Sequence, residues 1–274
     1  MELLYCYTFV MKTLHILIVV TVIFLGACLY FFLADKVEAP SDGLNTSDGV
    51  VVSAVSHASF VLEFAGLTIF NDPVGDFETY VTYGVPDLIL LSDIHGDHLD
   101  IQTLINVAGE ETVLVAPQAV LDKLPLELHD KTVVMANEDF HQVGEMTIEA
   151  IPMYNLPPAN DAYHVKGRGN GYVLEYGETR VYIAGDTADI PEMRSLENID
   201  IAFIPMNLPY TMDVDTAAEA VLAFAPKVVY PYHYRGTEGL SDIAEFTRMV
   251  AVKNSAIEVR NLDWYPAEVD VTEE

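Results

Sequence analysis

The residues from Asp93 to His98 combine side chains that bind metal ions with a spacing that lets them converge. This six-residue stretch contains four metal-binding side chains: Asp93, His95, Asp97 and His98. It follows the apolar run 86–91, which predicts a buried strand. Alternating residues can point the same way, and a turn at Gly96 can bring His98 back toward them. Imidazole nitrogens mixed with carboxylate oxygens favour zinc, manganese or iron over calcium. We therefore predict a transition-metal site; the alternative is a solvated acidic loop with two surface histidines.

Further groups of the same chemical types border other predicted strands. Asp186 follows the run 181–185, and His233 follows the run 228–232. His164 precedes a strand, and His57 lies between two. The only two cysteines are Cys6 and Cys28, so the chain beyond them has neither a thiolate ligand nor a disulfide of its own. Any metal site there must use imidazoles and carboxylates.

The chain between residues 50 and 261 alternates strands and helices in two strand-rich halves. We predict strands at 50–55, 59–64, 67–70, 88–91, 113–116, 132–135, 147–151, 171–176, 180–184, 201–205, 227–231 and 257–261. We predict helices at 99–107, 118–124, 216–224 and 241–252, the last with Ser241 as its N-cap. Two sheets packed face to face with helices outside would bury these runs. The predicted fold class is therefore mixed α/β (α+β).

Composition limits the kinds of partner. The 274 residues are 51% hydrophobic, which suffices for one large domain with a substantial core. The formal net charge of −29 would repel the phosphates of nucleic acid. We therefore expect a small-molecule or lipid-like substrate and no nucleic-acid partner; the sequence does not indicate an oligomeric state.

Residues 14–33 form an uncharged apolar run of 20 residues. At ~1.5 Å per residue, such a helix spans a bilayer core of ~30 Å. We predict a transmembrane signal anchor in residues 1–33, a polar linker at 34–49 and a catalytic domain at 50–274. Lys12 precedes the run, and this charge bias favours an extracytoplasmic domain. The alternatives are a buried core helix or a cleaved signal, including a lipoprotein form with Cys28 lipidated.

Over roughly residues 50–262 the sequence resembles the metallo-β-lactamase superfamily. The family motif His-x-His-x-Asp-His corresponds to Asp93-Ile94-His95-Gly96-Asp97-His98, the later Gly-Asp-Thr motif to Gly185-Asp186-Thr187, and the final histidine to His233. Ser56-His57-Ala58-Ser59-Phe60 and Asn71-Asp72-Pro73 resemble elements of the branch that includes ascorbate-phosphate lactonase-like and phospholipase D-like hydrolases. The resemblance implies a four-layer αββα sandwich, preceded here by one hydrophobic N-terminal helix.

The resemblance also implies a site for two divalent metal ions. We expect zinc, with manganese or iron as alternatives. By family analogy, one ion is held by His95 and His164, with the contribution of Asp93, and the other by Asp97, His98 and His233. Asp186 would bridge both, and Asp97 and Asp186 are the predicted catalytic carboxylates. Water between such ions loses a proton near neutral pH and becomes a nucleophile.

Two positions depart from the family pattern. Asp93 stands where family members usually carry histidine, so it either binds an ion or supports a residue that does. His164 comes about ten residues after the usual position of the third histidine, so it is either a metal ligand or a substrate contact. We expect His57 and Asp72 to orient ligands, although His57 could instead be a core histidine. His129 and His141 are predicted surface residues.

The implied activity is hydrolysis of an ester, a lactone or a phosphodiester. Asp186 argues against β-lactam hydrolysis, because the best-known lactamases carry cysteine or serine there. Lys166 and Arg168 could neutralise an anionic substrate group or be solvated loop charges, and Tyr210 could line the pocket. One alternative is a non-catalytic metal- or ligand-binding domain with a degraded site. Another is redox chemistry at a di-iron site, which His95 disfavours because such family members carry glutamate there.

Overall fold

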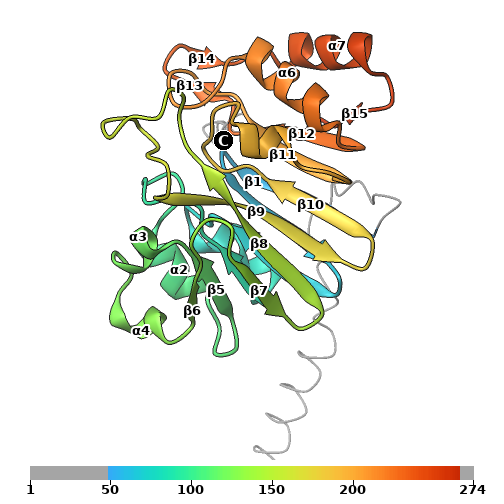
Figure 1. Ribbon diagram of the computed structural model, residues 1–274. Coiled ribbons are helices and arrows are strands. Elements are labelled where there is room, and N and C mark those ends of the chain that lie inside the picture. Colours follow the sequence, from blue (N-terminus) through green and yellow to red (C-terminus); the bar gives the residue numbers. More distant parts are fainter. Residues whose placement is uncertain (1–48, 266–274) are drawn as a thin grey trace, which may run out of the picture. The chain divides into compact units, whose positions relative to one another are not determined.

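The computed structural model describes residues 49–265, which form two β-sheets and the helices that cover them (Figure 1). The predicted membrane anchor and all of the predicted linker except Gly49 lie outside these residues. Within residues 49–265 no helix is both long and apolar enough to cross a bilayer.

The first sheet contains six strands, whose spatial order is the same as their order in the chain. They are β1 (Val51–Ser56), β2 (Ser59–Phe64), β3 (Leu67–Asn71), β4 (Leu88–Leu90), β5 (Val113–Ala116) and β6 (Thr132–Val134). The first three pair antiparallel, and β3 to β6 pair in parallel. The connections contain the 3₁₀ helices η1 (Phe77–Thr79) and η2 (Val81–Tyr83) and the helices α2 (Ile101–Val107), α3 (Gln118–Leu121) and α4 (Leu126–His129). The Asp100 carboxylate caps α2 by accepting from two backbone amides of its first turn.

The second sheet contains seven strands in the order β15-β12-β11-β10-β9-β8-β7. They are β7 (Phe140–Val143), β8 (Met146–Met153), β9 (Gly169–Tyr176), β10 (Thr179–Ile183), β11 (Ile201–Pro205), β12 (Val228–Tyr232) and β15 (Glu258–Val259). Its helices are α5 (Pro191–Arg194), α6 (Val214–Phe224) and α7 (Ile243–Lys253), and a small hairpin pairs β13 (Arg235–Gly236) with β14 (Gly239–Leu240). Strands β7 to β10 pair antiparallel, whereas β10, β11, β12 and β15 pair in parallel.

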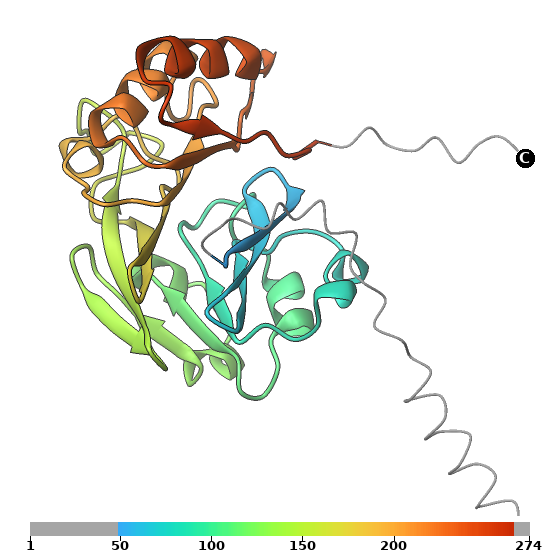
Figure 2. The same cartoon turned by 90° about the vertical axis from the view of Figure 1, so that its right-hand side faces the viewer.

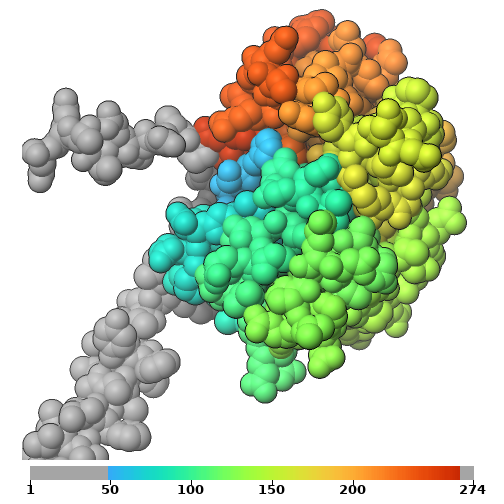
Figure 3. Space-filling model, turned by 90° about the vertical axis from the view of Figure 1, so that its left-hand side faces the viewer, coloured from blue at the N-terminus to red at the C-terminus, as the bar shows by residue number. Residues whose placement is uncertain are grey.

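Three apolar clusters hold the layers together. The central one joins side chains of both sheets, and within it the rings of Phe60 and Phe203 stack at 4.3 Å across the interface. A second cluster lies between the second sheet and α5, α6 and α7, and a third lies under the helices of the first sheet. Figure 2 shows the two sheets facing one another with helices outside, and Figure 3 shows blue-to-green segments of the first half beside yellow-to-red segments of the second. The predicted αββα sandwich is confirmed.

Two local predictions were wrong in detail. The N-cap of α7 is Asp242, whose carboxylate accepts from Glu245 N at 2.9 Å, whereas the Ser241 hydroxyl donates to the Met206 carbonyl. The final strand is shorter than predicted, because only Glu258–Val259 pair with β12. The edge strand β7 was not predicted, because its residues are exposed or half-buried and so lack an apolar run.

Candidate metal centre

Three buried histidines surround the carboxylate of Asp186. His98 Nε2 and His164 Nε2 lie 3.3 Å and 3.2 Å from Asp186 Oδ2, and His233 Nε2 lies 3.2 Å from Oδ1. Asp186 comes just after β10, and His233 directly follows β12. The carboxyl ends of β10 and β12, which flank β11 in the second sheet, thereby bring groups that are remote in sequence to one point.

Hydrogen bonds fix which nitrogen two of these rings present. His98 Nδ1 lies 2.8 Å from Asp72 Oδ2, and His164 Nδ1 lies 3.2 Å from the Tyr210 carbonyl oxygen. A carboxylate or carbonyl oxygen only accepts, so each Nδ1 carries a proton and each Nε2 is the nitrogen that faces Asp186 and can bind a metal ion. This arrangement is typical of histidines that bind metal ions.

The donor set fits a metal ion. Within the described residues, the buried atoms His164 Nε2 and Asp186 Oδ1 have no hydrogen-bond partner. Each has an ion-pair neighbour at 3.2 Å that makes no hydrogen bond with it. His98 Nε2 and His233 Nε2 also face each other at 3.1 Å. Unpaired lone pairs that converge in a buried space are costly unless a cation lies among them.

Three groups of possible ligands make up the candidate centre, and the third, His57, Asp97 and His233, shares His233 with the first. The first is His98, Asp186 and His233, which we call the His233 half; the second is Asp93, His95 and His164, which we call the Asp93 half. In each group the ligand atoms all lie within 4.8 Å of one another. His164 lies near both halves, because its Nε2 is 3.8 Å from Asp93 Oδ2 and 3.2 Å from Asp186 Oδ2.

In the Asp93 half, the carboxylate of Asp93 has several partners. His95 Nδ1 lies 2.6 Å from Asp93 Oδ2, and Arg168 donates to both carboxylate oxygens at 3.0–3.1 Å. Asp93 is fully buried, whereas the His95 side chain is 38% exposed. Asp93 thus lies within the centre, beneath the more accessible His95.

Asp97 lies on the exposed edge of the centre, with its side chain 42% exposed. Its Oδ2 is 3.4 Å from His57 Nε2 and 3.5 Å from His233 Nε2. His57 is held by Tyr265, whose hydroxyl lies 2.7 Å from Nδ1, and its ring lies 3.9 Å from that of His233. Solvent therefore reaches the centre on the side of Asp97 and His95.

The charges at this site favour a cation. Burial raises the pKa of Asp186, but the imidazoles of His233 and His98 outweigh burial and hold that pKa well below its usual range. Burial lowers the pKa of His98, but Asp186 and Asp72 outweigh it and raise that pKa well above normal. Burial lowers the pKa of His233. The carboxylates thus draw positive charge toward the buried residues of the centre.

Several residues of the centre have strained backbones. His57, Asp72 and His233 have φ values of +55°, +41° and +47°, which non-glycine residues seldom adopt. Such strain persists where the surrounding structure over-determines it, often at functional sites. At His233 the backbone amide donates to the His57 carbonyl at 3.2 Å, which ties the second sheet to the first.

The structure brings together all seven predicted ligands, with His57 and Asp72 beside them. Lys166 and Arg168 are each paired with a carboxylate, Glu192 and Asp93 respectively. Tyr210 approaches the centre through its carbonyl, and its ring lies 5.0 Å from that of Tyr163. His129 bonds the Leu124 carbonyl at 3.0 Å, and neither it nor His141 belongs to any of the metal-ligand groups found in residues 49–265.

Sequence reasoning missed four supporting residues. They are Ser92, whose hydroxyl donates to Asp72; Asn155, whose side chain accepts from His164 N; Asn207, whose amide lies 3.0 Å from His233 Nδ1; and Tyr265. Asn207 stands two residues after the buried strand β11. A polar residue just after a predicted buried strand could have indicated a supporting role at the site. Tyr265 has no comparable signal, because it meets His57 from the far end of the described chain.

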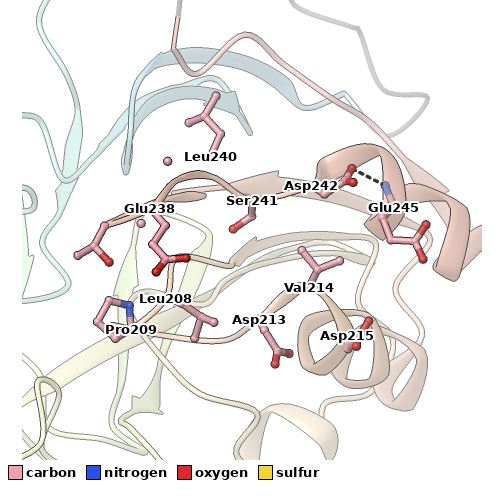
Figure 4. A pocket seen from close by; sticks show the side chains of 13 residues that line it. Leu208, Pro209, Asp213, Val214, Asp215, Glu238, Leu240, Ser241, Asp242 and Glu245 are labelled. Carbon is pink, nitrogen blue, oxygen red and sulfur yellow. Dashed lines mark hydrogen bonds between the residues drawn. The ribbon is translucent and has the colours of Figure 1, made fainter.

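A separate cavity of about 610 Å³ lies beside the β13–β14 hairpin (Figure 4). Leu208, Pro209 and Leu240 line it together with acidic residues. Two of those acids, Asp213 and Asp242, are the N-caps of α6 and α7, and no histidine lines the cavity. The cavity contains none of the residues of the candidate centre, so we do not assign the chemistry to it.

Comparisons with known proteins agree with this geometry. The model of the β-lactamase superfamily domain matches residues 52–233, which include the centre from His57 to His233. A solved structure of a proposed metal-dependent hydrolase from Parabacteroides distasonis is 39% identical, with a TM-score of 0.71, covering 82% of this chain and 98% of the other. A metal-dependent hydrolase of Pyrococcus horikoshii is 28% identical over 219 residues, which are 76% of this chain and 95% of that protein. The metallo hydrolase Igni18 of Ignicoccus hospitalis shares the fold, with a TM-score of 0.65 at 22% identity over 78% of this chain and 94% of its own.

Proposed function

The chain belongs to the β-lactamase superfamily and is a metal-dependent hydrolase, and from this premise we propose that it uses two divalent ions to hydrolyse an ester, lactone or phosphodiester. The single observation that carries the proposal is the convergence of three imidazole nitrogens on the two oxygens of Asp186 at 3.2–3.3 Å. We favour zinc, because histidine-rich donor sets suit it, with manganese or iron as alternatives.

In this proposal each half of the centre would hold one ion, and Asp186 would serve as a ligand in the His233 half and lie next to His164 of the Asp93 half. When bound, such ions lower the pKa of water and polarise the oxygen of the scissile bond. Asp72 holds the His98 ring through Nδ1, so that Nε2 stays available as a ligand. Asn207 positions the ring of His233, and the Tyr210 carbonyl positions the ring of His164.

Asp97 is the carboxylate that we assign to the attacking water. It is the most exposed acid of the centre, and burial raises its pKa less than His233 and His57 lower it. Asp97 therefore remains ionised over the physiological range and can accept a hydrogen bond from water at the solvent-facing edge. His57 keeps Asp97 oriented through the contact at 3.4 Å.

Exposed apolar side chains near the ligands favour a substrate with an apolar group, either a small molecule or a lipid-like one. Tyr163 precedes His164 and is 51% exposed, and Leu208 follows Asn207 and is 52% exposed. The formal net charge of −29 disfavours polyanionic substrates. We therefore place a neutral or singly charged ester, lactone or phosphodiester at this site.

The test is a hydrolysis panel on the full chain in mild detergent, loaded with zinc or manganese. The panel contains short and long acyl esters, a lactone and an aryl phosphodiester. We expect turnover of at least one class, loss of turnover on chelation, and a loss of at least about a hundredfold in Asp186→Ala, in line with metal chemistry that supplies several kcal/mol. His129→Ala, a histidine outside the centre, is the matched control and should keep full activity. Turnover that survives both chelation and Asp186→Ala would reject the proposal.

We also propose that residues 14–33 attach the enzyme to a membrane, with the catalytic domain on the extracytoplasmic side. The support is the uncharged apolar run itself and the lysine that precedes it. Membrane fractionation with protease protection tests this: the domain should sediment with membranes and be cleaved from outside. A protein found wholly in the soluble fraction at full length would contradict it, whereas a shortened soluble form would indicate a cleaved signal.

A further inference from the structure

Arg168 holds the buried carboxylate of Asp93 within the candidate centre. Its Nε donates to Asp93 Oδ1 at 3.1 Å and its Nη2 to Oδ2 at 3.0 Å. The interaction of a guanidinium with a carboxylate through two hydrogen bonds is both stronger and more directional than a single hydrogen bond. The negative charge that Asp93 brings to its half of the centre is therefore already matched by a positive one.

The fold fixes this guanidinium in place. Asn170 N donates to the Ser92 carbonyl at 3.0 Å, which presses the backbone after Arg168 against the end of β4. A Cβ on Gly169 would lie 2.8 Å from that same carbonyl oxygen and 2.3 Å from Met153 Cε. Arg168 Nη2 also donates to the Tyr163 carbonyl at 2.6 Å. Arg168 is thus a built part of the centre, unlike a solvated surface charge.

The His233 half has no comparable cation. Within residues 49–265 the ion-pair partners of Asp186 in that half, and of the neighbouring Asp97, are all histidines, and a histidine that binds a metal ion is neutral. A divalent ion in the His233 half therefore meets the carboxylate of Asp186 with its full charge, and that of Asp97 lies beside it. An ion in the Asp93 half meets a carboxylate whose charge is shared with Arg168, and it is also repelled by the guanidinium.

We propose that Arg168 makes the two metal positions unequal, so that the Asp93 half binds its ion more weakly than the His233 half. The inference rests on the proposed function, in which both halves hold an ion. The ion of the His233 half binds first, and the ion of the Asp93 half competes with Arg168 for Asp93 Oδ2. An activity that needs both ions then responds to the concentration of free metal over the range set by the weaker position.

The test is a titration of the full chain with Zn²⁺ after removal of bound metal. Calorimetry and competition with a chromophoric chelator measure the binding. We expect two binding steps whose dissociation constants differ by at least tenfold. Arg168→Gln should strengthen the weaker step at least tenfold and leave the stronger step within about twofold. Arg180→Gln is the matched control, because Arg180 is also 21% exposed and pairs with two glutamates, but lies at the opposite end of β10.

The outcomes separate the inference from the proposed function. Two steps of equal affinity in the unaltered chain, or a weaker second step in Arg168→Gln, would overturn the inference and leave the dinuclear hydrolase intact. A chain that binds no Zn²⁺ at all would overturn the proposed function instead.

A double variant tests the same inference if Arg168→Gln does not fold. Removing Arg168 alone leaves Asp93 buried without its cation, which is destabilising. The double variant Asp93→His with Arg168→Gln removes both charges together and places an imidazole beside His95. We expect two steps within about threefold of each other. A double variant that loses the second ion would show that the Asp93–Arg168 pair supports binding there, contrary to the inference.

Discussion

The two sheets supply the candidate centre in different ways. The first sheet provides a continuous loop after β4, in which His98 N and Leu99 N both donate to the His95 carbonyl and form one compact turn. The second sheet provides single residues, His164, Asp186 and His233, from three separate connections. The loop depends on local turn geometry, whereas the scattered residues depend on the pairing of whole strands. The two contributions should therefore respond differently to substitution.

The largest expected effect on metal affinity comes from the residues that hold the rings of two ligands, Asp72 beside His98 and Asn207 beside His233. Asp72→Asn should weaken metal binding by about 10–100-fold, because an amide places a donor where Ser92 or His98 also donates. Asn207→Ala should weaken it by about tenfold or less, since His233 keeps its backbone bond to His57. Metal titration of both variants checks the order.

Asp87→Asn is the control for the first of these variants. Asp87 also accepts from a backbone amide, that of Thr68 at 2.8 Å, but it is remote from the centre. The metal affinity of the Asp87→Asn variant should match that of the unaltered chain. If Asn207→Ala weakened metal binding more than Asp72→Asn, the expected order of the two supports would be wrong.

A smaller effect is expected where the two sheets touch behind the centre. Gly169→Ala would drive a methyl group toward the Ser92 carbonyl and Met153, and should lower the free energy of unfolding by about 1–3 kcal/mol. Gly96→Ala, inside the ligand loop, meets no atom within 4 Å and should leave stability unchanged. Denaturant unfolding of both variants measures the difference, and equal midpoints would contradict the close fit at Gly169.

The contribution of the first sheet could be predicted from the sequence almost completely. Apolar residues before Asp93 indicate the strand, and the crowding of four ligand types after it indicates the site. Asp186 and His233 could also be placed, because each follows a short buried run that predicts a strand end. Local pattern suffices in these cases because the ligand and its strand are adjacent in the chain.

The remaining features depend on contacts that no local pattern encodes. The pairing of Arg168 with Asp93 joins residues that are remote in sequence, and it arises because β9 begins against the end of β4. The position of His164 likewise depends on the Tyr210 carbonyl, which lies in another connection, and on Asn155, which lies nine residues earlier in the same one. The edge strand β7 was missed because an exposed strand needs no apolar run.

The most direct test of the account is a crystal structure of the metal-loaded protein with anomalous diffraction recorded at the metal absorption edge. We predict two peaks about 3.5–4 Å apart, one enclosed by His98, Asp186 and His233 and the other beside His95 and His164, with the weaker peak in the Asp93 half. A map with no peak at Asp186, or with metal bound only elsewhere on the chain, would contradict the central claim.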